Sequence, residues 1–95
     1  MNNNSRNIIW LPSVRDKLIQ FRSARFTAEE TLDFISNVVL EVESLLENPV
    51  VGQVYTEEKG KYKGMSRIVI KRFRIYFEQI QNDIVIVAIL FPGEK

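Results

Sequence analysis

The sequence contains no cysteine and no histidine. Without cysteine, the chain can have neither a disulfide framework nor a thiolate metal site. Without histidine, it lacks the commonest general base and the commonest zinc ligand. Metal-dependent chemistry would therefore rest on carboxylates, and the basic stretch of residues 59–77 contains none. We expect a protein without a cofactor or a bound metal.

Long apolar runs are also absent. The longest, residues 84–92, is too short to span a bilayer, and the polar residues 1–5 lack the apolar core of a signal peptide. The chain has 95 residues, of which 45% are hydrophobic and 26% charged, as is typical of one soluble globular domain. We expect a single domain over residues 1–95 with residues 1–6 flexible, a cytoplasmic location and no membrane association.

Charge is distributed unevenly along the chain, although the formal net charge is only +1. Residues 26–58 contain eight acidic residues and no Lys or Arg, whereas residues 59–77 contain seven basic residues and no acid. The basic residues are Lys59, Lys61, Lys63, Arg67, Lys71, Arg72 and Arg74, and they are interleaved with Tyr62, Phe73, Tyr76 and Phe77. Such a surface suits an anionic partner, either nucleic acid or an acidic protein segment. The same pattern fits a solvated sheet face equally well.

The first part of the chain predicts a short strand and a helix. Residues 7–11 form a mostly apolar run that ends at Pro12, which fits a first strand. Beyond Pro12, Ser13 can cap a helix, and apolar residues recur at helical spacing. We therefore expect this helix to continue to about Ala24.

A second helix is indicated by a capping box at Thr27 and Glu30, in which each side chain bonds the backbone of the other residue. Asn48 and Pro49 are expected to end the helix. Between them, apolar residues recur every three or four positions and predict one continuous stripe. The stripe consists of Ala28, Leu32, Ile35, Val39, Val42 and Leu46, widened by Phe34, Val38 and Leu45. The two helices should form a hairpin that covers an apolar surface.

The remainder predicts a sheet. Residues 50–63 are polar and turn-rich, and strands are expected over residues 67–70, 73–78 and 84–90. Alternation in the second strand places Arg74, Tyr76 and Glu78 on one face and apolar residues on the other. The third strand is apolar at every position, so it should be central and buried on both faces. Whether Lys71 and Arg72 form a tight turn or a bulge is open, because neither is Gly or Asn. The predicted fold is α+β, with an N-terminal strand, a helical hairpin and a three-stranded antiparallel meander forming a twisted sheet.

Three short motifs occur in a recognisable order within these elements. They are Asn48-Pro49-Val50-Val51-Gly52, Tyr62-Lys63-Gly64-Met65-Ser66-Arg67 and Phe73-Arg74-Ile75-Tyr76-Phe77. From Trp10 to the end, this arrangement resembles the RelE/ParE superfamily of toxins from bacterial type II toxin–antitoxin pairs. The resemblance implies a twisted antiparallel sheet backed by the helical hairpin. It also implies an antitoxin partner that wraps the toxin and neutralises its basic surface.

Two mechanisms occur on this fold, and they imply different sites. RelE-like members cut messenger RNA on the ribosome, whereas ParE-like members poison DNA gyrase and need no hydrolytic site. Arg67 and Arg74 match strand arginines that would hold a phosphate, because a guanidinium group suits bidentate contact. The candidate target-binding or RNA-binding residues are Lys61, Lys63, Arg67, Lys71, Arg72, Arg74 and Phe91. The alternative for Arg67 and Arg74 is that they only solubilise the outer face of the sheet.

The end of the chain departs from the ribonuclease pattern. RNA-cutting members usually carry His, Arg or Tyr after the last strand, and residues 90–95 contain none of these. Phe91 could stack on a base but cannot transfer a proton. Glu78 and Tyr76 are conceivable substitutes, although Glu78 is more simply a surface strand residue.

We therefore favour a toxin that acts on gyrase and inhibits growth. The first alternative is a ribosome-dependent, metal-free mRNA endoribonuclease with Arg67, Arg74 and Glu78 as candidate catalytic residues. The second is a non-catalytic basic binding module or an inactive family member. The sequence predicts no oligomeric state.

Overall fold

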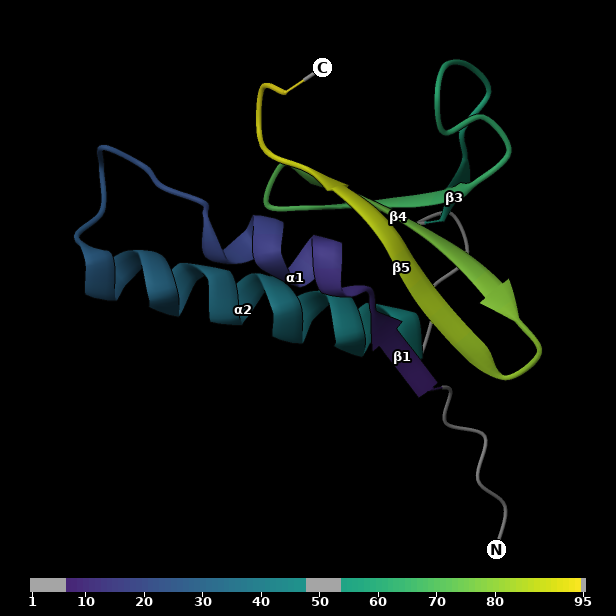
Figure 1. Cartoon of the computed structure of the whole chain (residues 1–95), viewed down its shortest axis with the longest axis horizontal. Coiled ribbons are helices and arrows are strands. Elements are labelled where there is room, and N and C mark those ends of the chain that lie inside the picture. Colours follow the sequence, from purple (N-terminus) through teal and green to yellow (C-terminus); the bar gives the residue numbers. More distant parts are fainter. Residues whose placement is uncertain (1–6, 48–53, 95) are drawn as a thin grey trace, which may run out of the picture.

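The computed structural model describes residues 7–47 and 54–94, which form a five-stranded sheet with two helices packed against one of its faces (Figure 1). The elements in chain order are β1 (Asn7–Trp10), α1 (Pro12–Ile19), α2 (Ala28–Glu47), β2 (Tyr55–Thr56), β3 (Ser66–Ile70), β4 (Phe73–Ile80) and β5 (Asp83–Leu90). Within these described ranges, neither helix combines the length and the apolarity needed to cross a membrane.

The sheet is mixed, with the strand order β1-β5-β4-β3-β2. The predicted antiparallel meander is present as β3, β4 and β5, but the prediction of a purely antiparallel sheet is wrong, because β1 pairs in parallel with β5. A parallel pair needs a long connection between its strands, and both helices lie between β1 and β5 in the chain. The segment predicted to contain only turns also provides β2, which pairs with the start of β3.

The first helix is shorter than predicted and has a different cap. Leu11 is the N-cap residue and makes no side-chain cap bond, so the prediction of a Ser13 cap is wrong. Pro12 occupies the first helical position, where its fixed φ favours the helix and its missing N–H is not needed. The helix ends at Ile19 rather than near Ala24. There, Arg22 Nη1 donates hydrogen bonds to the carbonyls of Ile19 and Phe21 at 2.8 and 2.7 Å.

The second helix begins as predicted. The Glu30 amide donates to Thr27 Oγ1 at 3.1 Å, and the Thr27 amide donates to Glu30 Oε1 at 2.9 Å, which confirms the capping box. The predicted apolar stripe is buried only in the later turns of α2. In the first turns, Leu32 is 66% exposed and Ala28 is also exposed. The first turns of α2 project beyond the sheet (Figure 1), so their apolar side chains have no strand to cover. The predicted helix end at Asn48 and Pro49 lies outside the described residues.

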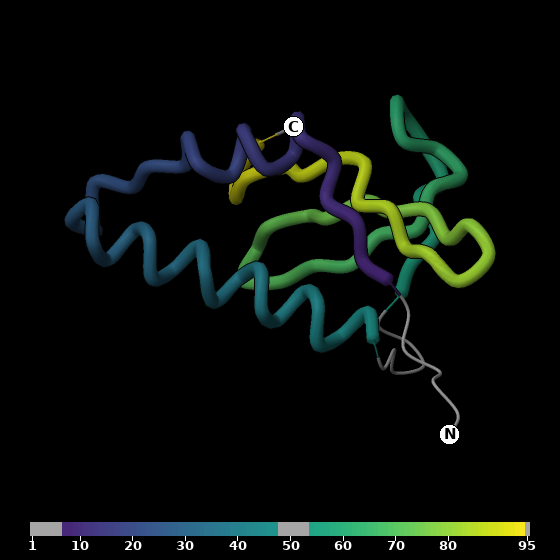
Figure 2. The backbone as a smooth tube through the Cα atoms, turned by 60° about the horizontal axis from the view of Figure 1, so that its bottom comes forward, coloured from purple at the N-terminus to yellow at the C-terminus, as the bar shows by residue number. Residues whose placement is uncertain are grey.

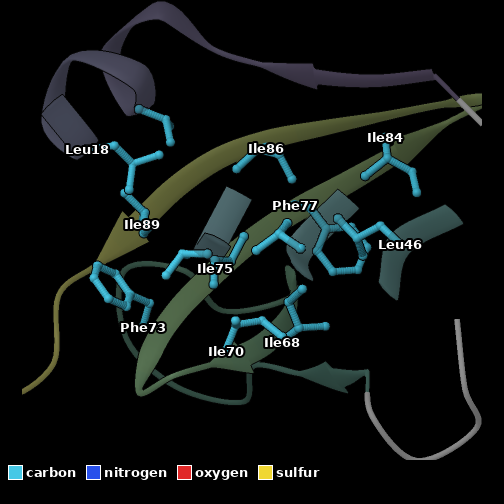
Figure 3. Close-up of a cluster of buried hydrophobic side chains, with 13 residues drawn as sticks. Leu18, Leu46, Ile68, Ile70, Phe73, Ile75, Phe77, Ile84, Ile86 and Ile89 are labelled. Atoms are coloured by element: carbon cyan, nitrogen blue, oxygen red, sulfur yellow. The ribbon is translucent and has the colours of Figure 1, made fainter. Parts of the chain in front are cut away.

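The core lies between the helices and the inner face of the sheet (Figure 3). From the helices it takes Val14, Leu18, Val38, Val42 and Leu46, and from the sheet Ile68, Ile70, Phe73, Ile75, Phe77, Ile84, Ile86 and Ile89. The sheet contribution follows the predicted alternation in β4. It also confirms β5 as a central strand, which pairs on both edges. Of the outward residues of β5, Leu90 is buried, but Val85 and Ala88 are only half-buried, so burial on both faces is incomplete.

The turn between β3 and β4 consists of Lys71 and Arg72 alone, since Ile70 and Phe73 already form a cross-strand pair. The φ angles of Lys71 and Arg72 are 49° and 73°. Both residues therefore adopt the left-handed conformation that two-residue hairpin turns require, for which Asn-Gly is the preferred sequence. For residues with a Cβ atom this conformation costs about 1–2 kcal/mol each. Lys71 and Arg72 therefore form a tight turn and not a bulge, although both residue types are poorly suited to such a turn.

We expect Thr27→Ala to lower the free energy of unfolding by about 1 kcal/mol, because the Glu30 amide loses its side-chain acceptor at the start of α2. Urea denaturation followed by circular dichroism measures this change. Thr27→Ser keeps the hydroxyl and is the matched control. Equal losses in both variants would mean that the threonine methyl group, rather than the cap, carries the effect.

Candidate functional site

The face of the sheet opposite the helices carries the two strand arginines. Arg67 lies opposite Tyr76, and Val69 lies opposite Arg74, in the pairing of β3 with β4. Directly opposed residues of an antiparallel pair share a face, so these four side chains lie on one surface. Since their neighbours in sequence form the core, this surface faces away from the helices. We call it the outer face.

A hollow of about 440 Å³ opens on the outer face, and we call it the outer hollow. Its lining residues come from α1, from the segment between β2 and β3, from β4, from the end of β5 and from the segment that follows β5. They are Lys17, Glu57, Lys59, Lys61, Tyr62, Arg74, Tyr76, Leu90 and Glu94. Of the residues predicted from the sequence, the outer hollow contains Lys61 and Arg74.

The floor of the outer hollow contains two stacked tyrosines. The rings of Tyr62 and Tyr76 lie 4.4 Å apart between centroids with an interplanar angle of 21°. Tyr76 is consequently only 2% exposed, although its strand position faces outward. Lys61 Nζ lies 5.7 Å from the Tyr62 ring centroid, within the range of a cation–π contact. Tyr62 therefore presents the aromatic surface here, and Tyr76 supports it from below.

Arg67 lies beside the outer hollow and is held by two neighbours. Its Nη1 atom lies 3.0 Å from Glu57 Oε1, and its guanidinium carbon lies 4.3 Å from the centroid of the Tyr55 ring. Its side chain is 24% exposed. The Nε atom is buried and has no partner among the described residues. The charge of Arg67 is thus largely matched by Glu57, whereas Arg74 forms no salt bridge with any residue that the structure describes.

The end of the chain folds back onto the outer hollow. Lys17 Nζ donates to both carboxylate oxygens of Glu94, at 2.8 and 2.9 Å, and to the carbonyl of Ile89 at 2.7 Å. The Phe91 amide donates to Glu94 Oε1 at 2.8 Å, and Arg74 donates to the Glu94 carbonyl. The hydrogen bond from Lys17, followed by that from Phe91, lowers the pKa of Glu94 below its ordinary value of 4.5. The carboxylate form is therefore favoured, and it anchors the tail.

The other predicted site residues lie elsewhere. Glu78 is exposed on the outer face, and Lys63 is exposed in the turn before β3, but neither lines the outer hollow. Phe91 is half-buried, with its ring edge-to-face against Phe21 at 5.1 Å. Two further candidates, Lys71 and Arg72, line a separate hollow that the β3–β4 turn shares with the connection between the helices. Of the predicted binding residues, Lys61 and Arg74 thus line the outer hollow and Lys71 and Arg72 line the other. Lys63, Arg67 and Phe91 line neither.

Sequence reasoning missed Lys17 and Glu57 as parts of the outer hollow. Lys17 lies in a helix, far along the chain from Glu94, and only the folded sheet brings the two together. Nothing in the local sequence of Lys17 distinguishes it from other surface lysines. Glu57 could have been noticed as one of the last two acids before the basic stretch, where a short hairpin would return it towards Arg67.

The arrangement is suited to holding anions. Among the residues that the structure describes, no three potential metal-ligating side chains of Asp, Glu, His or Cys gather closely enough to hold an ion. The two carboxylates of the outer hollow each pair with a cation, Glu57 with Arg67 and Glu94 with Lys17. Among the described residues, Lys59, Lys61 and Arg74 form no salt bridge, although Arg74 donates a hydrogen bond to the Glu94 carbonyl.

A model of the family described as "ParE toxin of type II toxin-antitoxin system, parDE" matches residues 8–91. The chain belongs to the ParE toxin family. This confirms the resemblance to the RelE/ParE superfamily, identifies the chain as the toxin of a type II toxin–antitoxin system and implies an antitoxin as its partner. A comparison with curated proteins gave no significant match.

The lowered pKa of Glu94 makes the tail contact dependent on pH. Because the pKa in the folded state lies below that of the unfolded chain, the contact stabilises the fold above about pH 4.5. This contribution is lost as the pH falls through the lowered pKa. In Lys17→Met the largest cause is removed, so the pKa of Glu94 should rise towards 4.5, as measured by NMR titration of its carboxyl carbon. Lys63→Met is the control, and an unchanged Glu94 titration in Lys17→Met would contradict this assignment.

Proposed function

We propose that this ParE-family chain inhibits growth by binding DNA gyrase in the cytoplasm, and that its antitoxin prevents this by covering the basic surface. The observation that carries the proposal is the state of the ionisable groups in the outer hollow. Cations are available there, but both carboxylates are engaged in ion pairs. Such a site is suited to contact with an anionic surface, and poorly suited to proton transfer.

RNA cleavage would require a base to activate the 2′-hydroxyl and an acid to protonate the leaving oxygen. A general base works best when its pKa lies near the working pH, and the pKa of Glu94 is lowered instead. The sequence contains no histidine. Binding without hydrolysis is therefore the function that these groups support best.

The outer hollow also supports one alternative, ribosome-dependent mRNA cleavage. Arg74 and Lys61 line it together with the stacked Tyr62 ring. A phosphate held by Arg74 would lie within the same hollow as an aromatic face on which a base can stack. This alternative needs a group that can transfer a proton. Glu57 could serve only if it separated from Arg67, with which it forms an ion pair.

The proposal is tested with purified gyrase, supercoiled plasmid, ATP and the full chain, followed by detergent and protease treatment. We expect linear DNA to accumulate, because a gyrase poison traps the cleaved complex. Replacing Lys61 and Arg74 by alanine should raise the concentration needed for half-maximal linear DNA roughly tenfold or more, since each charged hydrogen bond contributes about 1.5–3 kcal/mol. Arg15→Ala removes an exposed charge from α1, outside both hollows, and should leave the effect unchanged.

Mapping of transcript 5′ ends in cells that express the chain alone separates the two mechanisms. New ends inside translated messages, without linear DNA in the gyrase assay, would refute the gyrase proposal in favour of mRNA cleavage. Growth arrest without new ends is the expected result. Normal growth with folded protein would contradict both mechanisms and leave a non-catalytic binding module.

A further inference from the structure

A second hollow, of about 520 Å³, lies at the end of the molecule where the connection between α1 and α2 meets the β3–β4 turn. We call it the tip hollow. Four cationic side chains line it: Arg22 and Arg25 from the helix connection, and Lys71 and Arg72 from the turn. Within the described part of the chain, no acidic residue contributes to its lining. Arg22 and Arg25 precede the acidic stretch of the sequence, so only folding joins them to the basic turn.

The base of the tip hollow is aromatic. Phe21, Phe26 and Phe34 line it and are half-buried. The ring centroids of Phe26 and Phe34 lie 5.2 Å apart, and those of Phe21 and Phe34 lie 6.0 Å apart. Behind them, Phe21 contacts Phe73 and Phe91, so the lining is continuous with the packed core. These rings are therefore held in place before any ligand arrives.

The cations differ in how far they are already engaged. Arg22 uses Nη1 to cap the carbonyls at the end of α1, which orients its guanidinium and leaves its other N–H groups available. Lys71 Nζ lies 3.2 Å from Glu41 in an exposed ion pair. No described residue offers the Arg25 or Arg72 side chain a hydrogen bond or an ion pair. At least two charges at the rim are thus uncompensated.

The turn provides an independent indication. Lys71 and Arg72 both adopt positive φ angles, at positions where Asn and Gly are the favoured residues. Backbone strain of this kind persists at functional sites, where the side chains are needed more than the turn geometry. Two basic side chains thus occupy a strained turn at the rim of an aromatic hollow, where Asn and Gly would suit the backbone better.

We propose that the tip hollow binds a nucleotide, with its phosphate on the guanidinium and ammonium groups and its base on the phenylalanine rings. Guanidinium groups match the geometry of phosphate oxygens, and single-stranded nucleic acids bind where cations and aromatic faces combine. An acidic peptide would use the cations but leave the aromatic lining without a flat partner. The ligand can be a free nucleotide or one unit of a single strand. The inference stands apart from the action on gyrase, since it concerns a different surface.

The test measures the fluorescence anisotropy of a labelled eight-nucleotide thymidine strand bound to the full chain. Replacing Arg25 with Ala and Arg72 with Gly together should weaken binding roughly tenfold or more and lower the dependence of log Kd on log salt, because two phosphate contacts are lost. Phe26→Leu should weaken binding severalfold with an unchanged salt dependence, because it removes a stacking face. Arg15→Ala is the control for a lost surface charge. Arg74→Ala is the control for the outer hollow.

The turn allows a second measurement on the same fold. Lys71→Asn combined with Arg72→Gly should raise the melting temperature by about 5 °C, since both residues then suit the turn, while binding of the strand falls. Loss of binding in a more stable protein cannot be attributed to misfolding. A variant that is more stable and binds the strand as tightly as the parent would overturn the proposal.

Competition identifies the source of the nucleotide. Displacement of the labelled strand by AMP would show that a free nucleotide suffices, whereas displacement only by unlabelled strand would assign the tip hollow to nucleic acid. Either result supports the proposal. Equal displacement by an eight-residue glutamate peptide would overturn it, because the aromatic lining would then contribute nothing. Binding that depends on Arg74 and not on Arg25, Arg72 or Phe26 would also overturn it.

Discussion

The pairing of β5 on both of its edges is the constraint on which the rest of the structure depends. β1 pairs with it in parallel and β4 pairs with it antiparallel, while Ile84, Ile86 and Ile89 face the helices in the core. Between β1 and β5 the chain must form both helices and the hairpin of β3 and β4. Segments that are distant in sequence therefore lie side by side, as Figure 2 shows for β1 (purple) and β5 (yellow). The side chains of both hollows come from such segments.

Leu90, the last residue of β5, and the residues that follow it contribute to both hollows. Leu90 and Glu94 line the outer hollow, Pro92 lines the tip hollow, and Phe91 packs into the aromatic cluster between α1 and β4. Lys17 joins this segment to α1 through Glu94, and its Nζ atom also lies 4.9 Å from the centroid of the Phe91 ring. A segment whose sequence carries no catalytic residue thus has a structural role. It forms part of the wall of both basic surfaces.

Two ion pairs among the described residues join the acidic stretch of the sequence to the basic stretch, Glu57 with Arg67 and Glu41 with Lys71. Among the described residues, Lys71 and Glu41 form the only ion pair between the basic hairpin and the acidic helix, and it is exposed. Exposed pairs of this kind contribute little to stability, about 0–1 kcal/mol. The basic residues are instead divided between the outer face and the tip. The ParE family supplies the context for this surface, since it implies an antitoxin as the partner of this chain.

The sequence by itself determined the α+β class, the family and much of the local structure, although the cap and the end of α1 were predicted wrongly. The Thr27 capping box, the alternation in β4 and the apolar run of β5 act over a few residues, so their patterns could be recognised directly. Tertiary structure decided what depends on distant partners. It paired β1 in parallel, covered Tyr76 with Tyr62, engaged Glu57 and Glu94 in ion pairs, and separated Lys71 and Arg72 from Arg74. A local pattern specifies the face on which a side chain lies. It does not specify which segment, distant in sequence, packs against that side chain.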